Sequence, residues 1–188
     1  MKYICIILVI CSIILLFISY FIRTYDINQI NQNINTIISP SDGTVMNITE
    51  NENTYCVSLF LSIVDNHRQT TPYNGVIENI IYKKGEYNLA YLYESKYNKR
   101  IEYYINTILG PIIVKQYAGK ITPNIYSYVS KGDYVYKGNN IGIILLGSRV
   151  DVIFPKNSIE YPDKKIIPLV HKHQKIYIGQ PIAYIKMI

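Results

Sequence analysis

The chain has 188 residues, of which 49% are hydrophobic and 17% are charged, and its net charge is +6. This composition excludes a largely disordered chain, and the length suits one domain with an added anchor rather than two full domains. The basic balance favours an anionic partner, either a nucleic acid or an acidic lipid surface.

The N-terminal segment is apolar: residues 3–22 carry no charge and lie between Lys2 and Arg23. About 20 apolar residues span a hydrocarbon core of roughly 30 Å. A cleavable signal peptide has a shorter apolar region and ends in small residues, which the sequence after Arg23 does not offer. We therefore predict one transmembrane helix with its flanks over residues 1–25, and a membrane location, single-pass or peripheral. Basic residues on both flanks leave its orientation open.

The remainder of the chain divides into a linker and a β domain. Residues 26–38 are polar and Asn-rich, which predicts a linker. Short apolar runs punctuated by Gly and Pro follow, and this pattern is typical of an all-β sandwich or barrel. We predict a mainly β, barrel-sandwich-like domain over residues 39–188, with a helical or loop insertion near residues 87–97. The runs that predict strands are residues 54–64, 75–82, 101–104, 111–117, 134–136, 142–146, 150–154 and 176–185.

Two candidate binding functions find little support in the sequence. His171 and His173 have the spacing of metal ligands along a strand, but they lack companion ligands and have basic neighbours. Exposed histidines in a Lys-rich loop are the favoured interpretation, so we predict no metal site. The basic charge is not accompanied by an aromatic-basic motif, so we predict no nucleic-acid partner.

A Gly147-Ser148-Arg149 step separates two apolar runs near the end of the chain. On its own such a step predicts a β-bulge or a tight turn, where Gly relieves the backbone and Ser bonds locally. Four other short blocks give it a different context, in this order along the chain: Pro40-Ser41-Asp42-Gly43; Phe60-Leu61-Ser62 with Asp65-Asn66-His67-Arg68 and Pro72; Gly85-Glu86-Tyr87 with Asn98-Lys99-Arg100; and residues 132–138.

With these blocks in this order, the sequence resembles the phosphatidylserine decarboxylase family, most closely its short, single-domain branch, whose processing site also reads Gly-Ser-Arg-Val-Asp. The resemblance implies that the chain cuts itself between Gly147 and Ser148 and converts Ser148 into a pyruvoyl cofactor. That group serves as an electron sink for decarboxylating phosphatidylserine to phosphatidylethanolamine in a membrane. It also implies that the fragments 1–147 and 148–188 stay associated. A homodimer is left open.

The resemblance also assigns roles to three further residues. Asp42 and His67 match family positions that act in proton transfer, so we expect both to assist catalysis. Longer members carry a second histidine where this chain has Thr70, which leaves a complete Ser-His-Asp relay in question. Arg149 follows the nucleophile and is predicted to bind the lipid carboxylate or phosphate, with a solvated charge or an ion pair to Asp151 as the equal alternative.

Other functions remain in competition. A membrane-anchored β domain acting as an adaptor or carrier would need no chemistry at Ser148. A carrier needs a modifiable lysine at a hairpin tip, whereas Lys186-Met187 lies at the chain end. A decarboxylase of a related lipid such as archaetidylserine would use the same chemistry on the same serine headgroup.

Overall fold

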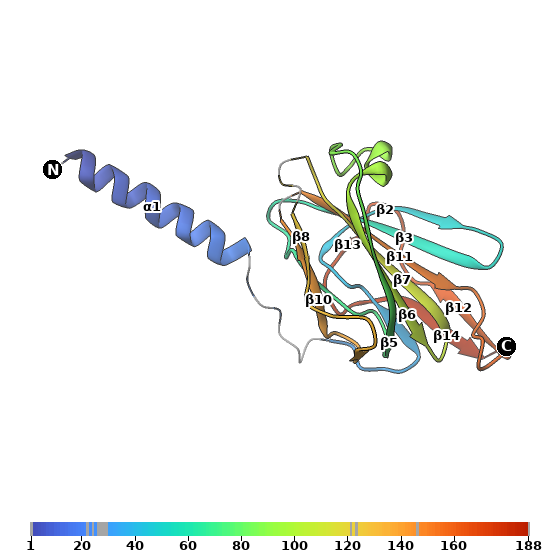
Figure 1. The fold of residues 1–188 in the computed structure, drawn as a ribbon. Coiled ribbons are helices and arrows are strands. Elements are labelled where there is room, and N and C mark those ends of the chain that lie inside the picture. Colours follow the sequence, from blue (N-terminus) through green and yellow to red (C-terminus); the bar gives the residue numbers. More distant parts are fainter. Residues whose placement is uncertain are drawn as a thin grey trace.

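The computed structural model describes residues 2–21, 23, 25, 30–120, 122, 124–145 and 147–187 (Figure 1). Parts of three predicted segments lie outside these: residues 1, 22 and 24 of the anchor, 26–29 of the linker, and 146 of the strand predicted over 142–146. The described chain is mainly β, as predicted, with one long helix at its N-terminus. Its strands are β1 (Thr36–Ile38), β2 (Gly43–Glu50), β3 (Thr54–Leu61), β4 (Arg68–Thr70), β5 (Gly75–Lys83), β6 (Arg100–Thr107), β7 (Gly110–Tyr117), β8 (Ile125–Ser127), β9 (Tyr134–Val135), β10 (Asn140–Ile144), β11 (Ser148–Pro155), β12 (Lys164–Pro168), β13 (Lys175–Ile176) and β14 (Pro181–Met187).

The N-terminal helix α1 (Lys2–Phe21) stands apart from the β domain. Figure 1 shows it extending from the side of the domain where β8 and β10 lie. Its window Tyr3–Tyr20 has a mean hydropathy of 2.8 and is not buried against any other part of the structure. The helix is therefore long and apolar enough to cross a membrane, and the predicted crossing stays a prediction.

The strands form three antiparallel sheets. The largest has eight strands in the order β13-β2-β3-β11-β7-β6-β5-β9, and two three-stranded sheets have the orders β1-β14-β12 and β4-β10-β8. Strand β11 is an inner strand, paired along its length with β3 and over five residues with β7. Its side chains Val150, Val152 and Phe154 are fully buried in the core. The chain segment that begins at Ser148 is therefore central to the fold. The more specific barrel-sandwich arrangement stays a prediction.

The predicted linker extends too far in one respect. Residues 36–38 form strand β1, which pairs with β14, and Ile37 and Ile38 are fully buried. The sequence did not predict this strand, because it follows polar Asn residues and three residues are too few to show the alternating hydrophobic pattern of a strand. The folded domain thus begins before residue 39.

An insertion between β5 and β6 carries the short helix η2 (Tyr93–Tyr97), within the region predicted to be a helix or loop. Buried Asn98 fastens it, since its side-chain amide donates to the carbonyls of Asn88 and Ala118, both at 2.8 Å. A Cβ at Gly85 would lie 2.3 Å from the Tyr97 carbonyl oxygen, so only glycine fits at that crossing. The insertion is thus held by main-chain and amide hydrogen bonds rather than by a core of its own.

Candidate active site

Ser148 and His67 lie at one junction between two sheets. Ser148 opens β11 and faces Leu61, the last residue of β3 in the large sheet. The chain then passes from β3 to β4, where the His67 carbonyl accepts a 3.1 Å hydrogen bond from the Ile144 amide at the end of β10. Two connections, β3 to β4 and β10 to β11, are therefore tied together at both ends. The structure brings the predicted nucleophile and the predicted histidine to the same pair of connections.

Ser148 has an unusual environment for a serine. Its side chain is fully buried, and its Oγ has no hydrogen-bond partner among the described residues. A buried hydroxyl without a partner costs about 1–3 kcal/mol, so such groups are rare without a reason. The preceding Gly147 has a φ of +64°, in the left-handed region that glycine adopts most readily. A buried hydroxyl without a partner among the described residues therefore follows a left-handed glycine at the predicted cleavage site.

His67 is fully buried and oriented by the main chain. Its Nδ1 lies 2.7 Å from the Asp65 carbonyl oxygen, and a carbonyl only accepts. Nδ1 therefore carries the hydrogen in the neutral ring and Nε2 carries the lone pair. Burial, with a smaller effect of the Arg23 charge, lowers the pKa of His67 to about 4 although Asp65 opposes the shift. The ring is thus neutral at pH 7 and equipped to accept a proton.

Asp65 fixes the turn that carries this carbonyl. Its Oδ2 accepts hydrogen bonds from the Ser62 amide at 2.9 Å and the Ser62 hydroxyl at 2.8 Å. Its Oδ1 forms an ion pair with Lys175, which begins β13. Burial raises the pKa of the Asp65 carboxyl, but the hydrogen bonds from Lys175 and Ser62 outweigh burial and lower the pKa below its usual value. The carboxylate is therefore charged, and it holds the turn that orients His67.

Asp42 is buried and contacts Asn66, the residue that precedes His67 in the chain. Its Oδ2 accepts from the Asn66 amide at 3.2 Å and pairs with Arg23 at 3.5 Å. Its Oδ1 accepts from the Ile178 amide at 2.9 Å. The partner of His67 Nδ1 is the Asp65 carbonyl oxygen and not Asp42, the residue predicted to act as the acid of the relay. The role of Asp42 in proton transfer stays a prediction.

Thr70 supports the segment that carries Asp42. Its amide donates to the Pro40 carbonyl at 2.8 Å, and its hydroxyl lies 3.4 Å from the same oxygen. Where longer family members have a second histidine, this chain has a buried hydroxyl that contacts main chain. The assignment of His67 as the base stays a prediction.

Arg149 is held by protein groups. Its guanidinium forms two hydrogen bonds with Asp151, at 2.8 and 3.0 Å, and contacts Ser58 and Ser95, both at 3.2 Å. Burial lowers the pKa of Arg149, but the Asp151 carboxylate outweighs it and raises the pKa. The ion pair with Asp151, the alternative interpretation from the sequence, therefore describes this structure. Lipid binding by Arg149 stays a prediction.

A mostly apolar pocket of about 260 Å³ adjoins the cleavage site. Gly147 forms part of its wall, together with residues of β3, of the β3–β4 connection and of the insertion. Gly147, the first residue of the predicted cleavage step, is therefore exposed to this pocket. Its lining residues are Phe60, Ser62, Ile63, Leu89, Ala90, Tyr91, Lys120 and Gly147.

Sequence reasoning missed three contributors to this site: the Asp65 carbonyl, Lys175 and the pocket. Asp65 stands in a quoted block, so its position was visible but the use of its main chain was not. Lys175 is 110 residues from Asp65 in the chain. No local pattern predicts a partner at that separation.

Comparisons with known proteins identify the family of the chain. The sequence model of the family described as phosphatidylserine decarboxylase matches residues 14–184. A putative archaetidylserine decarboxylase proenzyme of Methanosarcina barkeri is 39% identical over 146 residues, which cover 78% of this chain and 66% of that protein. A phosphatidylserine decarboxylase proenzyme of Carboxydothermus hydrogenoformans is 33% identical over 175 residues, covering 89% of this chain and 78% of that protein.

The match to several relatives is partial in length. A second archaeal relative, from Methanosarcina mazei, is 42% identical over 119 residues, which cover 63% of this chain and 55% of that protein. The chain thus spans between about half and two thirds of the archaeal relatives it matches.

Proposed function

The chain belongs to the phosphatidylserine decarboxylase family, and we propose that it cuts itself at Gly147–Ser148 and then decarboxylates phosphatidylserine to phosphatidylethanolamine. One observation carries this proposal: the buried Ser148 hydroxyl has no hydrogen-bond partner among the described residues and follows a left-handed glycine. A neutral, buried His67 at the same junction supplies a base.

The first reaction uses only groups of this chain. The Ser148 Oγ attacks the Gly147 carbonyl carbon, the C–N bond breaks, and an ester replaces the amide while the hydroxyl proton passes to the freed nitrogen. His67 Nε2 is the group we assign to carry that proton. Glycine leaves the attacked carbon uncrowded. Elimination across the Ser148 Cα–Cβ bond then releases the Gly147 carboxylate, and addition of water releases ammonia.

The site fits the pyruvoyl group that this reaction forms. The Ser148 side chain, which has no hydrogen-bond partner within the described part of the chain, lies at the start of β11, where pairing with Leu61 fixes the main chain. The pocket beside Gly147 gives a substrate access from one side. When formed, the group supplies an electron sink that ordinary side chains lack. His67 remains available to hold or move a proton during decarboxylation.

The two fragments would stay associated after the cut. Residues 148–188 supply β11, β12, β13 and β14, and β11 lies between β3 and β7 of the larger fragment. The ion pair of Lys175 with Asp65 and the hydrogen bond from Ile178 to Asp42 also join the fragments beside His67. Breaking one peptide bond at the edge of this arrangement leaves its pairing and core in place.

Helix α1 serves in this proposal as the anchor, within residues 1–25, of a catalytic domain that follows the linker. A single apolar helix would keep the domain at the membrane that contains the lipid substrate. Archaetidylserine is the second candidate substrate, because relatives that share 39–42% identity carry that substrate in their names. Both lipids present the same serine headgroup to Ser148 and His67.

The test uses the full chain in vesicles that contain phosphatidylserine labelled in its carboxyl group. We expect labelled carbon dioxide from the unaltered chain and none from Ser148→Ala. Ser158→Ala is the matched control, because Ser158 is also buried but contacts the Ile108 carbonyl far from Gly147. Labelled carbon dioxide from Ser148→Ala at the control rate would contradict the pyruvoyl mechanism. If the unaltered chain stays uncut and releases no labelled carbon dioxide, the adaptor function would be favoured instead.

A further inference from the structure

The insertion between β5 and β6 exposes an unusual amount of aromatic and aliphatic surface. Its exposed fractions reach 71% at Tyr93 and 57% at Tyr91. Exposed apolar side chains that gather in one place mark an interaction surface, whereas scattered ones do not. The exposed large side chains of this segment are Tyr87, Leu89, Tyr91, Leu92, Tyr93 and Tyr97.

The surface continues onto the connection between β3 and β4. Ile63 and Val64 are 48% and 54% exposed, and Ile63 lines the pocket beside Gly147 together with Leu89 and Tyr91. The Tyr91 ring also meets the Phe60 ring edge-on, with centroids 6.0 Å apart. Insertion and connection therefore form one surface around the pocket, which we call the tyrosine face: residues 63–64 and 87–97.

The chain that follows helix α1 contacts this same connection. Both terminal nitrogens of Arg23 lie 3.4 Å from the Val64 carbonyl oxygen, and the Asn66 side chain donates to the Arg23 carbonyl at 2.9 Å. Helix α1 ends two residues before Arg23. A bilayer that holds α1 therefore has its surface close to Val64 and to the tyrosine face.

We propose that the tyrosine face lies in the headgroup region of the phospholipid bilayer that holds α1, so that the pocket beside Gly147 opens onto lipid. Tyrosine suits this region because its ring is apolar and its hydroxyl remains in contact with water and headgroups. This inference rests on the proposed anchor and lipid substrate, and adds how the substrate reaches Ser148: directly from the bilayer.

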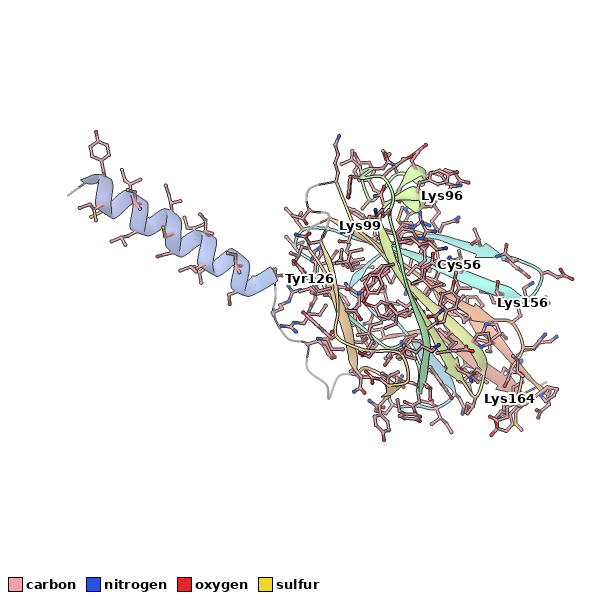
Figure 2. All side chains as sticks on the ribbon, in the orientation of Figure 1. Cys56, Lys96, Lys99, Tyr126, Lys156 and Lys164 are labelled. Carbon is pink, nitrogen blue, oxygen red and sulfur yellow. The ribbon has the colours of Figure 1, made fainter. Side chains whose placement is uncertain are left out.

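Charge contributes less to this contact than the aromatic rings do. Lys96 and Lys99 belong to the insertion. Figure 2 shows both at the end of the domain that carries the insertion, whereas Lys156 and Lys164 lie away from that end. The Lys96 ammonium lies 3.7 Å from the centroid of the Tyr93 ring. The insertion, residues 84–99, also carries Lys84, and Glu86 and Glu94 leave it a net charge of only +1. We therefore expect the contact to persist on bilayers without net charge.

The absence of tryptophan from the chain makes the surface easy to probe. Tyr91→Trp places a single fluorophore on the tyrosine face, and Tyr134→Trp is the matched control. Both tyrosines are 57% exposed, and both rings contact another ring edge-on. Tyr134 faces Val76 near the start of β5, and the insertion follows the end of β5, about 23 Å away at 3.3 Å per residue.

Each variant is reconstituted as the full chain in phosphatidylcholine vesicles whose acyl chains are brominated, and its fluorescence is compared with that in unbrominated vesicles. We expect quenching of Tyr91→Trp to be at least about twice that of Tyr134→Trp, as for aromatic residues at a membrane interface. Tyr93→Trp, which does not line the pocket, should be quenched like Tyr91→Trp. Equal quenching of all three variants, no quenching of the two face variants, or failure to float with the vesicles would overturn the proposal.

Carbon dioxide release on the same samples separates this proposal from the proposed function. A quenched Tyr93→Trp variant, whose substitution lies outside the pocket, that releases no carbon dioxide would support the surface and contradict the activity. Decarboxylation with unquenched face variants would contradict the surface and leave the activity standing.

Discussion

Two pockets among the described residues differ in size and in the hydrogen bonding of the polar groups near them. The larger, about 650 Å³, lies among the start of β5, the β6–β7 turn and residues 159–160, whereas the pocket beside Gly147 holds about 260 Å³. Around the larger one, the Tyr73 hydroxyl donates to the Ile34 carbonyl at 2.8 Å and the Thr107 hydroxyl to the Gly110 carbonyl at 2.7 Å. Beside the smaller one, the Ser148 hydroxyl is buried without a partner among the described residues.

The volume of a pocket alone therefore does not indicate where the proposed active site of this protein lies. The larger pocket is a reasonable first candidate for an active site, but the Tyr73 and Thr107 hydroxyls beside it already donate to main-chain carbonyls. Buried groups that depart from ordinary behaviour, such as Ser148 and the low-pKa His67, mark the smaller pocket instead. The following predictions test that contrast.

The largest effect is expected at His67. His67→Gln removes the buried base, so self-cleavage should slow on the order of 10²–10⁴-fold, the usual contribution of a positioned acid–base group. Fragment accumulation on a denaturing gel measures this rate. The control is His171→Gln, because His171 is exposed in the turn before β13. Cleavage of His67→Gln at the rate of the control would exclude His67 as the base.

The depressed pKa of His67 also predicts a pH dependence of stability. Folding lowers the pKa of this base from 6.5 to about 4, so the unfolded chain binds a proton first as the pH falls. Stability is therefore retained above pH 6.5 and lost as the pH falls to 4, by about 3 kcal/mol.

Urea unfolding of Ser148→Ala, which should stay uncut, measures this loss against the double variant Ser148→Ala/His67→Gln. The free energy of unfolding of the first should fall more steeply between pH 6.5 and 4. Parallel curves would show that His67 is not a buried neutral group.

Filling the two pockets should have unequal effects. Ala90 is buried in the wall of the smaller pocket, so Ala90→Phe should lower kcat/KM for the serine lipid by about tenfold or more. Val76→Phe fills the larger pocket and should leave kcat/KM within about twofold of the unaltered chain. Carbon dioxide release measures both. A greater loss from Val76→Phe would assign the substrate to the larger pocket.

The smallest effect concerns Lys175. Lys175→Gln removes the ion pair to Asp65 while the two Ser62 hydrogen bonds remain, and Lys175 is partly exposed. We expect a loss of at most about 1 kcal/mol in stability, with cleavage slowed only a few-fold. Lys172→Gln, an exposed lysine nearby in sequence, is the control. Loss of all cleavage in Lys175→Gln would show that Lys175 acts in the chemistry itself.

Much of the fold was predictable because its strands are long enough to show a pattern. The apolar runs around Val150 and Val57 predicted β11 and β3, and the uncharged segment predicted α1. Strand β1 was missed, since residues 36–38 are short and adjoin an Asn-rich segment. The order of strands also lay beyond prediction, because it depends on pairings between residues far apart in the chain.

The residues of the candidate site that lie in short sequence motifs could be predicted. Gly147, Ser148, His67 and Asp42 were all named from their blocks, and the structure brings them to one junction. The surroundings of His67 could not be predicted, because a main-chain carbonyl and a lysine 110 residues from Asp65 leave no local signature. The structure also gathers six exposed large side chains on one insertion, a surface that the sequence analysis did not predict.

Self-cleavage at Gly147–Ser148 changes the covalent chain, so the mass of the purified full chain tests it most directly. We expect two fragments, residues 1–147 and residues 148–188, in place of the 21.8 kDa chain. The smaller fragment should be lighter by one ammonia than the same fragment beginning with serine, and it should resist N-terminal sequencing. A single intact chain with an unmodified Ser148, or a small fragment that begins with a free serine, would contradict it.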